Sequence, residues 1–276
     1  MKRSSRRLPL DREHELADLA EAVTAGHKGR IEPLAIARAL KITTSFGNYA
    51  DAFDGLLEVQ DGRFHIYCNL DRVESEGAPR ARFTLGHELG HYFIDEHRDA
   101  LLAGATPSHP SFCDYQSPHL IEVEADCFAS NLLMPSSRFA ADAKKVLRGL
   151  PGIVKLAEAY GTSLTATAVR YLQMNLFPCV VVQWNNSGFH WKRLSTGAYV
   201  IGWRKTVEQV AQLPRDSPTG KLIKKPAPGV LECGTTKAAW FPFTDAKGDR
   251  NSIIREQAIS LGRYGVLTML LPDLGK

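Results

Sequence analysis

Apolar residues recur at helical spacing in two segments near the middle of the chain. Residues 82–94 carry one apolar stripe, and residues 120–133 carry a second that ends before Pro135. Spacing of three and four residues is typical of amphipathic helices, and proline is a stop signal. The pattern therefore predicts two helices. The connection at residues 103–119 is rich in proline, shows no helical period and is expected to be a loop.

Two further helices are predicted in residues 150–175, on either side of Gly161-Thr162-Ser163. A helix, a short turn with glycine and a second helix form the outline of a helix-turn-helix unit. Such a unit can contact DNA through its second helix. That helix offers only Arg170 as a strong contact to a base or phosphate, so we favour a packing role.

After residue 175 the pattern changes to one of strands. Two apolar runs, 179–184 and 189–194, flank the turn-forming segment 185–188, which is a strong hairpin signal. Three later segments are assigned by composition: strands at 239–243 and 265–271, and an exposed loop rich in Pro, Lys and Gly at 213–229. Residues 176–276 are therefore expected to form a mixed α/β domain.

Length and composition indicate a soluble globular protein. The 276 residues suit one large or two ordinary domains, and a hydrophobic content of 44% with 23% charged residues is ordinary for this class. The sequence shows no apolar run of membrane-spanning length, and its basic start lacks the apolar part of a signal peptide. Five cysteines without CxxC spacing are typical of a reducing compartment. We therefore expect a cytoplasmic protein.

Charge and tryptophan content differ between the two parts of the chain. Residues 1–175 carry 20 Lys and Arg against 23 Asp and Glu, whereas residues 176–276 carry 14 against 7 and contain all four tryptophans. Cations neutralise phosphates and aromatic faces stack on unpaired bases. Single-stranded nucleic acid is therefore a candidate regulator, with Lys224 and Lys225 as candidate contacts. The simpler alternative is that the tryptophans fill a core.

The candidate chemistry lies in the first predicted helix, which reads His87-Glu88-Leu89-Gly90-His91. Histidines four residues apart project from one face of a helix, so both imidazoles can bind one Zn²⁺. Glu88 lies beside the open coordination position, where a carboxylate can take a proton from the attacking water. Gly90 is a small residue at which another helix or a substrate can approach closely. The motif indicates a zinc-dependent hydrolase.

A third ligand is expected because a catalytic zinc usually has three protein ligands. Glu122 and Asp126 lie four residues apart in the second predicted helix, beside its apolar stripe. In our interpretation Glu122 binds the metal and Asp126 accepts the free ring N–H of His87 or His91. Glu124 points to another face and is the second choice. The alternative is a solvated acidic helix face without a metal.

These two motifs resemble those of the ImmA/IrrE metallopeptidases. The likeness lies in RFTLGHELGH and in E-x-x-A-D-x-F-A-x-x-L-L-M-P, and similarity extends over about residues 30–175. It implies that Glu122 is the metal ligand and Glu88 the catalytic acid/base, although the family typically has Asn at the position of Asp126. It also implies that residues 63–69 form the edge strand against which an extended substrate lies.

The resemblance further implies a function. ImmA/IrrE peptidases cleave a specific protein, usually a helix-turn-helix repressor, and thereby turn on a stress, mobile-element or defence operon. Longer members carry a GAF-like domain after the peptidase, and residues 176–276 fit its position and length. We therefore expect a zinc endopeptidase controlled by a signal at the second domain. The alternatives are a DNA-binding transcriptional regulator with a structural or vestigial metal site, and a module that only docks a partner.

Three more side chains are candidates for the same site. Cys113 lies in the connection between the motif helices, where its thiolate could occupy the fourth zinc position and hold the enzyme inactive. An incidental loop thiol is the alternative. Tyr171 or Arg170 could steady the oxyanion of the reaction.

The expected fold is α+β with two domains. Residues 1–175 are expected to form a mainly helical, zincin-like metallopeptidase domain with a small sheet, which includes the helix-turn-helix-like unit at about residues 150–175. Residues 176–276 are expected to form the sensor or regulatory domain.

Overall fold

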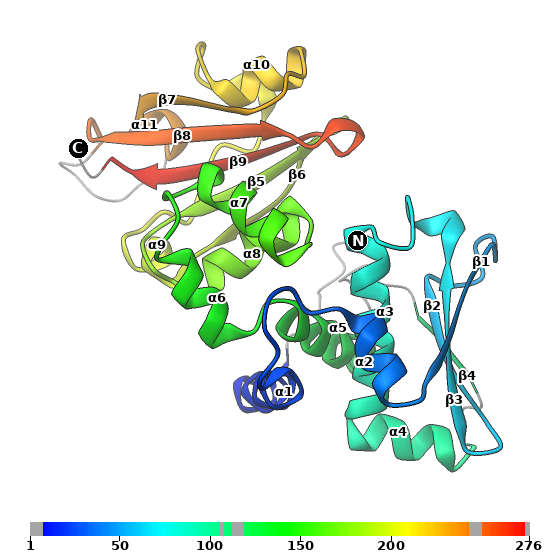
Figure 1. The fold of residues 1–276 in the computed structure, drawn as a ribbon. Helices are drawn as coiled ribbons and strands as arrows, with labels where there is room; N and C mark the ends of the chain where they lie inside the picture. The colour runs from blue at the N-terminus through cyan, green and yellow to red at the C-terminus, as the bar shows by residue number, and fades with distance from the viewer. Residues whose placement is uncertain (1–7, 105–107, 112–118, 243–249, 274–276) are drawn as a thin grey trace. The chain divides into compact units, whose positions relative to one another are not determined.

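The computed structural model describes residues 8–104, 108–111, 119–242 and 250–273 (Figure 1). Contacts divide the chain into two compact units: Met1–Phe139 with Glu158–Ser163, and Ala140–Ala157 with Leu164–Lys276. Each unit combines helices with one small sheet, so the α+β class is confirmed. The domain boundary at residue 175 stays a prediction from the sequence. Among the described residues, no helix has the length and apolar character needed to cross a membrane.

The described residues of the first unit include several helices. They are α1 (Leu10–Thr24), α2 (Pro33–Ala39), α3 (Pro79–Phe93), α4 (Asp95–Leu102) and α5 (Leu120–Leu133). α3 and α5 are the two helices that the apolar spacing predicts. Pro79 suits the first turn of α3 because its fixed φ is already helical and it has no N–H to leave unpaired. Buried leucines from α1, α3 and α5, including Leu16, Leu89 and Leu132, share one hydrophobic core.

α3 and α5 pack closely because small residues face each other across their contact. A Cβ atom at Gly90 would lie 3.1 Å from the Cα atom of Ala125. A Cβ atom at Gly86 would lie 3.5 Å from the Cβ atom of Ala129. Residues four apart lie on the same face of a helix, so two glycines of α3 oppose two alanines of α5. The close approach expected at Gly90 is therefore that of a helix.

The sheet of the first unit has the strand order β1-β3-β2-β4. β2 (Gly55–Gln60) pairs antiparallel with β3 (Arg63–Asn69) and with β4 (Ser108–Ser111), and β1 (Thr43–Gly47) pairs parallel with β3. The expectation that residues 63–69 form an edge strand is therefore wrong, because β3 has a neighbour on each side. The sequence of β1, TTSFG, is short and lacks apolar alternation, so it was not recognised as a strand. In the described part of this sheet, β1 and β4 are the edges.

The two faces of this sheet differ in polarity. Leu57, Ile66 and Cys68 are buried in the same core as α3 and α5. On the other face, the Nδ1 atom of His65 lies 2.6 Å from the hydroxyl of Thr43. Alternation of this kind is expected where one face of a sheet covers a core.

α6 (Ser136–Ala143), α7 (Leu150–Tyr160) and α8 (Leu164–Gln173) follow α5. Residues 161–163 join α7 to α8, which gives the helix-turn-helix outline expected from the sequence. Arg170 in α8 is only 6% exposed, and it donates a hydrogen bond to the side chain of Gln173 at 3.2 Å. Because that guanidinium is not presented to solvent, the packing role of this helix pair is favoured over DNA contact.

The second unit is built on an antiparallel sheet with the strand order β6-β5-β9-β8-β7 (Figure 1). Its strands are β5 (Val180–Asn185), β6 (Gly188–Leu194), β7 (Val230–Thr236), β8 (Ile253–Ser260) and β9 (Val266–Pro272). β5 and β6 form the hairpin predicted from the sequence, and β9 is the strand predicted at residues 265–271. Both predictions are confirmed.

Short helices account for two wrong predictions in this unit. The strand expected at 239–243 is absent at 239 and 240, which end α11 (Lys237–Trp240), and residue 243 lies outside the described residues. The expected loop 213–229 contains α10 (Pro218–Lys224), whose Leu222 is buried. Ser217 caps α10 by accepting the N–H of Gly220, and Pro218 begins it. Ser followed by Pro is a helix-start signal, so α10 was recognisable. The remaining short elements are α9 (Thr196–Val200) and the 3₁₀ helices η1 (Leu70–Arg72), η2 (Val210–Gln212) and η3 (Gly262–Tyr264).

A buried carboxylate holds α10 and α11 against the sheet. The side chain of Glu256 in β8 is fully buried. Its Oε1 atom accepts hydrogen bonds from the hydroxyl of Ser217 at 2.5 Å and the backbone N–H of Thr219 at 2.9 Å. Its Oε2 atom accepts one from the indole N–H of Trp240 at 2.8 Å. A buried carboxylate is costly unless such donors replace its water, so this contact fixes how both helices meet the sheet.

Thr268 in β9 extends this network through the core. Its hydroxyl accepts the indole N–H of Trp184 at 3.1 Å and shares a hydrogen bond of 2.6 Å with the hydroxyl of Thr219. The side chains of Trp184, Thr219 and Thr268 are all fully buried. Each of these polar groups would be left without a partner if Thr268 lost its oxygen.

We predict that Thr268→Val lowers the free energy of unfolding by about 1–3 kcal/mol, because it leaves buried donors unpaired while keeping the shape of the side chain. Urea titration followed by tryptophan fluorescence measures the change. Thr236→Val is the matched control, since Thr236 is exposed on β7 and should change stability by less than about 0.5 kcal/mol. Equal stability of wild type and Thr268→Val would show that the network does not hold this core together.

Candidate metal centre

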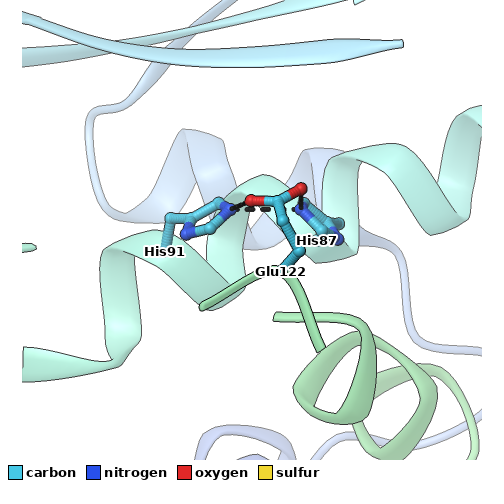
Figure 2. A group of neighbouring side chains, drawn as sticks. All are labelled: His87, His91 and Glu122. Atoms are coloured by element: carbon cyan, nitrogen blue, oxygen red, sulfur yellow. Dashed lines mark hydrogen bonds and ion pairs between the residues drawn. The ribbon is translucent and has the colours of Figure 1, made fainter. Parts of the chain in front are cut away.

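Three side chains from two helices converge in the first unit. His87 and His91 project from α3, and Glu122 projects from α5 toward both (Figure 2). The Nε2 atoms of the histidines lie 3.1 Å apart. Glu122 places Oε2 3.5 Å from the Nε2 atom of His87 and Oε1 3.4 Å from that of His91. All three residues are buried, so their polar atoms face one another and not water.

These donors fit a metal such as zinc. Two imidazole nitrogens and one carboxylate oxygen make up a common ligand set of catalytic zinc sites. With Zn–N distances of about 2.0–2.1 Å, two nitrogens of a tetrahedral site lie about 3.3 Å apart. The spacing of 3.1 Å between the two Nε2 atoms is close to this value, and one donor atom from each residue lies within 4.8 Å of the others. The cluster therefore has the composition and the size of a metal site.

Asp126 orients one of the two histidines. Its Oδ1 atom lies 2.8 Å from the Nδ1 atom of His87, on the side of the ring away from Glu122. A carboxylate in this position accepts the Nδ1–H and leaves the Nε2 lone pair for a metal. This is the contact that the spacing of Glu122 and Asp126 predicts from the sequence.

Glu124, the second choice for the metal ligand, lies elsewhere. Its Oε2 atom is 2.9 Å from the Nε2 atom of His97, and its carboxylate accepts hydrogen bonds from Arg12. His97 in turn places Nδ1 3.1 Å from the Nδ1 atom of His91. Sequence analysis missed His97 because α3 ends before it and the helical spacing that links His87 to His91 does not continue into α4.

Glu88 lies beneath the start of β2. Its side chain is fully buried, and a Cβ atom at Gly55 would lie 2.4 Å from its Oε1 atom and 2.5 Å from the Cγ2 atom of Thr84. Any side chain larger than hydrogen at position 55 would therefore collide with the carboxylate. Gly55 is a site residue that sequence analysis missed. An isolated glycine in a strand is a signal of close approach that could have pointed to it.

A buried carboxylate with two partly exposed arginine partners holds the chain next to Gly55. Asp54 is 2% exposed and accepts hydrogen bonds from Arg72 at 2.8 Å and Arg80 at 2.9 Å. Its backbone N–H donates to the carbonyl of Ser111 in β4. Without these partners the buried charge of Asp54 would be uncompensated, so the two ion pairs restrict how far β2 can move from Glu88.

The remaining candidates from the sequence belong to the second unit or lie outside the described residues. Tyr171 and Arg170 are buried and belong to the second unit, and burial raises the pKa of Tyr171 to about 12. Their oxyanion role stays a prediction. Lys224 and Lys225 are exposed at the end of α10. Cys113 lies outside the described residues.

A buried His-x-x-x-His pair with a third carboxylate ligand and an adjacent glutamate is the arrangement of zinc-dependent hydrolases. Comparison with known proteins agrees with this class. Residues 74–172 match the family model of peptidase family M78, the IrrE N-terminal-like domain. The matched segment contains α3 and α5 with all three cluster residues and Glu88. It confirms the resemblance to the ImmA/IrrE family.

The fold of the chain is also similar to that of a solved structure, a Mycobacterium tuberculosis transcriptional regulator. The TM-score is 0.57 at 14% sequence identity, and the alignment covers 95% of this chain and 78% of the other. At that identity the likeness concerns the fold alone. No curated protein matches the chain.

The glycine contact between α3 and α5 allows a matched test of the cluster. We predict that Gly86→Ala is neutral or stabilises by up to about 1 kcal/mol, because its Cβ meets ordinary contacts and alanine favours helix. In Gly90→Ala the added methyl group presses against the backbone of Ala125. We expect this variant to bind zinc about tenfold more weakly, which is the lower end of the effects seen when a group that orients a metal ligand is lost. Chelator competition measures zinc affinity and urea titration measures stability. Equal zinc affinity in the two variants would contradict the role of the close contact.

Proposed function

We propose that the chain is a zinc-dependent endopeptidase in which His87, His91 and Glu122 bind the metal and Glu88 is the general acid/base. The observation that carries this proposal is the convergence of three buried donors on one side of α3, with the Glu88 carboxylate fully buried beside them. The match of residues 74–172 to a peptidase family supports it.

The residues around the cluster have different roles in the proposed hydrolysis. A zinc ion at such a site supplies Lewis-acid chemistry, which polarises a carbonyl and lowers the pKa of water. Glu88 accepts the proton of the attacking water and delivers it to the leaving amine. Asp126 keeps the ring of His87 in the tautomer that leaves Nε2 free. Gly55 lets β2 cover Glu88 closely, which limits the access of bulk water to the carboxylate.

An extended substrate segment would bind by adding a strand to the sheet of the first unit. β3 is paired on both sides, so it cannot accept that strand. Of the two edges, we favour β4 as the one to which the substrate adds. Its partner β2 begins at Gly55, which lies beside Glu88 and pairs with Ser111 of β4. The resemblance to ImmA/IrrE peptidases supports a helix-turn-helix repressor as the substrate and release of a stress or defence operon as the outcome.

The proposal predicts that Glu88→Gln lowers the rate of substrate cleavage by about 10²–10⁴-fold, the usual contribution of a general acid/base, while the protein still binds zinc. The assay is co-expression with the helix-turn-helix protein encoded next to the chain, read by intact mass. Glu58→Gln is the matched control, because Glu58 is a carboxylate of the same unit that lies in β2 and accepts the hydroxyl of Tyr67.

A repressor fragment that forms equally with wild type and Glu88→Gln would contradict the peptidase. It would favour the alternative, a DNA-binding regulator with a structural or vestigial metal site. The burial of Arg170 disfavours that alternative, because the side chain is not presented to DNA by the helix-turn-helix-like unit.

The second unit is the proposed sensor domain, GAF-like by resemblance, and single-stranded DNA is its proposed signal. Trp184 and Trp240 are fully buried and Trp203 is 3% exposed, so these rings fill the core, as the simpler interpretation has it. Trp191 is half-buried, with the guanidinium of Arg193 5.7 Å from its ring centre. Stacking on bases is therefore left to Trp191, and contact with phosphates to exposed groups such as Lys224 and Lys225.

Two forms of control follow from this proposal, and one cleavage assay separates them. We predict that Cys113→Ala raises basal cleavage if the thiolate holds the fourth zinc position. We predict that single-stranded DNA raises cleavage by wild type, with a smaller effect when Lys224 and Lys225 are both replaced by Ala. Basal cleavage that stays the same or falls in Cys113→Ala would argue against the thiolate lock. An equal response of the lysine variant would exclude those lysines as contacts.

A further inference from the structure

A line of hydrogen bonds runs from His91 away from the metal cluster and ends at an arginine of α1. The Nδ1 atom of His91 lies 3.1 Å from the Nδ1 atom of His97, and the Nε2 atom of His97 lies 2.9 Å from the Oε2 atom of Glu124. Arg12 donates to Oε1 of Glu124 from Nε at 3.0 Å and to Oε2 from Nη2 at 3.3 Å. We call His97, Glu124 and Arg12 the His97 relay. Its members come from three different helices, and His91 belongs to a fourth.

The positions of the protons follow from the geometry. A metal at Nε2 of His91 requires the proton of that ring to sit on Nδ1, so His91 donates and Nδ1 of His97 accepts. The neutral ring of His97 then carries its own proton on Nε2, which faces the carboxylate of Glu124. Each bond of the line therefore has one donor and one acceptor, and the line has one direction, from His91 toward Glu124.

Burial and charge agree with this assignment. His97 is 6% exposed, and its Nε2 atom lies 2.9 Å from the carboxylate of Glu124, which accepts the N–H. Glu124 is charge-paired with Arg12, and their side chains are 16% and 19% exposed. A bidentate, partly buried arginine–carboxylate pair is more restricted in geometry than an exposed one.

The two histidines of the cluster are therefore oriented by different means. His87 contacts a carboxylate directly through Asp126 at 2.8 Å. His91 reaches the carboxylate of Glu124 through the ring of His97. We propose that His97 and Glu124 are positioning residues that fix the ring of His91 for metal binding, with Arg12 of α1 as the outer anchor.

This inference rests on the proposed metal site and adds a role for α1. Arg12 precedes the segment 74–172 that matches the peptidase family model. Arg12 also donates a hydrogen bond of 3.2 Å to Glu96, the residue before His97. It therefore connects α1 to both α4 and α5. A helix outside the matched segment thereby contributes to the orientation of a metal ligand.

The test is the zinc affinity of the full-length protein, measured by competition with a chromophoric chelator after metal removal. His97→Ala should raise the Kd for zinc about 10–100-fold, the usual effect of losing a group that orients a ligand. Arg12→Ala should raise it less, because Glu124 keeps its contact with His97. His65→Ala is the matched control, since His65 lies in the same unit and bonds to Thr43. It should leave zinc affinity unchanged.

Two amide variants separate positioning from simple packing. The amide of Asn overlays the Nδ1 side of an imidazole, and the amide of Gln overlays the Nε2 side. His97→Asn can still accept the N–H of His91, so its Kd should stay within a few-fold of wild type. His97→Gln keeps only the side that faces Glu124, so its Kd should rise as far as that of His97→Ala. Circular dichroism of the metal-free variants verifies that each one folds.

Equal zinc affinity of wild type, His97→Ala and His97→Gln would overturn the relay while leaving the metal site in place. Equal losses in His97→Asn and His97→Gln would also overturn it, because packing alone would explain them. A folded wild type that does not bind zinc would overturn the metal site itself, and the relay with it.

Discussion

The close packing of α3 on α5 is the constraint on which the first unit depends. Gly86 and Gly90 oppose alanines of α5, so the two helix backbones approach closely along the same turns that carry the candidate ligands. His87 and His91 occupy the positions next to these glycines in the sequence, and Glu122 lies three residues before Ala125. Because a four-residue repeat places side chains on one face of a helix, the same periodicity serves both packing and the metal cluster.

Groups around this contact keep the cluster buried and oriented. Gly55 lets β2 lie directly over Glu88, and the paired Asp54 next to it restricts β2. The Nδ1 atoms of His87 and His91 are held on the outer side, by Asp126 in one case and by His97 in the other. Buried polar groups are stable only when partnered, so the cluster and its supports form one interdependent unit. In the second unit the polar network around Glu256 has a structural role of the same kind.

The sequence was informative where one helix sets the geometry, and less so where distant segments meet. The motif on α3 and the Glu122 and Asp126 spacing on α5 follow from helical periodicity, so the cluster could be predicted. His97 could not, because it lies beyond the break between α3 and α4, and its contacts depend on where α1 and α5 fold. The prediction that β3 lies at the edge of its sheet was wrong. Its pairing with β1 is a long-range contact, which the alternation of residues within one strand does not reveal. Gly55 and the Ser217 cap carried local signals that could have been used.

The most direct test of this account is X-ray absorption spectroscopy of the zinc-loaded protein at the zinc edge. The account predicts a first shell that contains two imidazole nitrogens at about 2.0–2.1 Å and oxygen from Glu122 at about 2.0–2.2 Å. The imidazole signal should fall to one ring in His91→Ala. A protein that retains no zinc, or a metal shell without two imidazoles, would contradict the central claim that the α3–α5 contact builds a metal site.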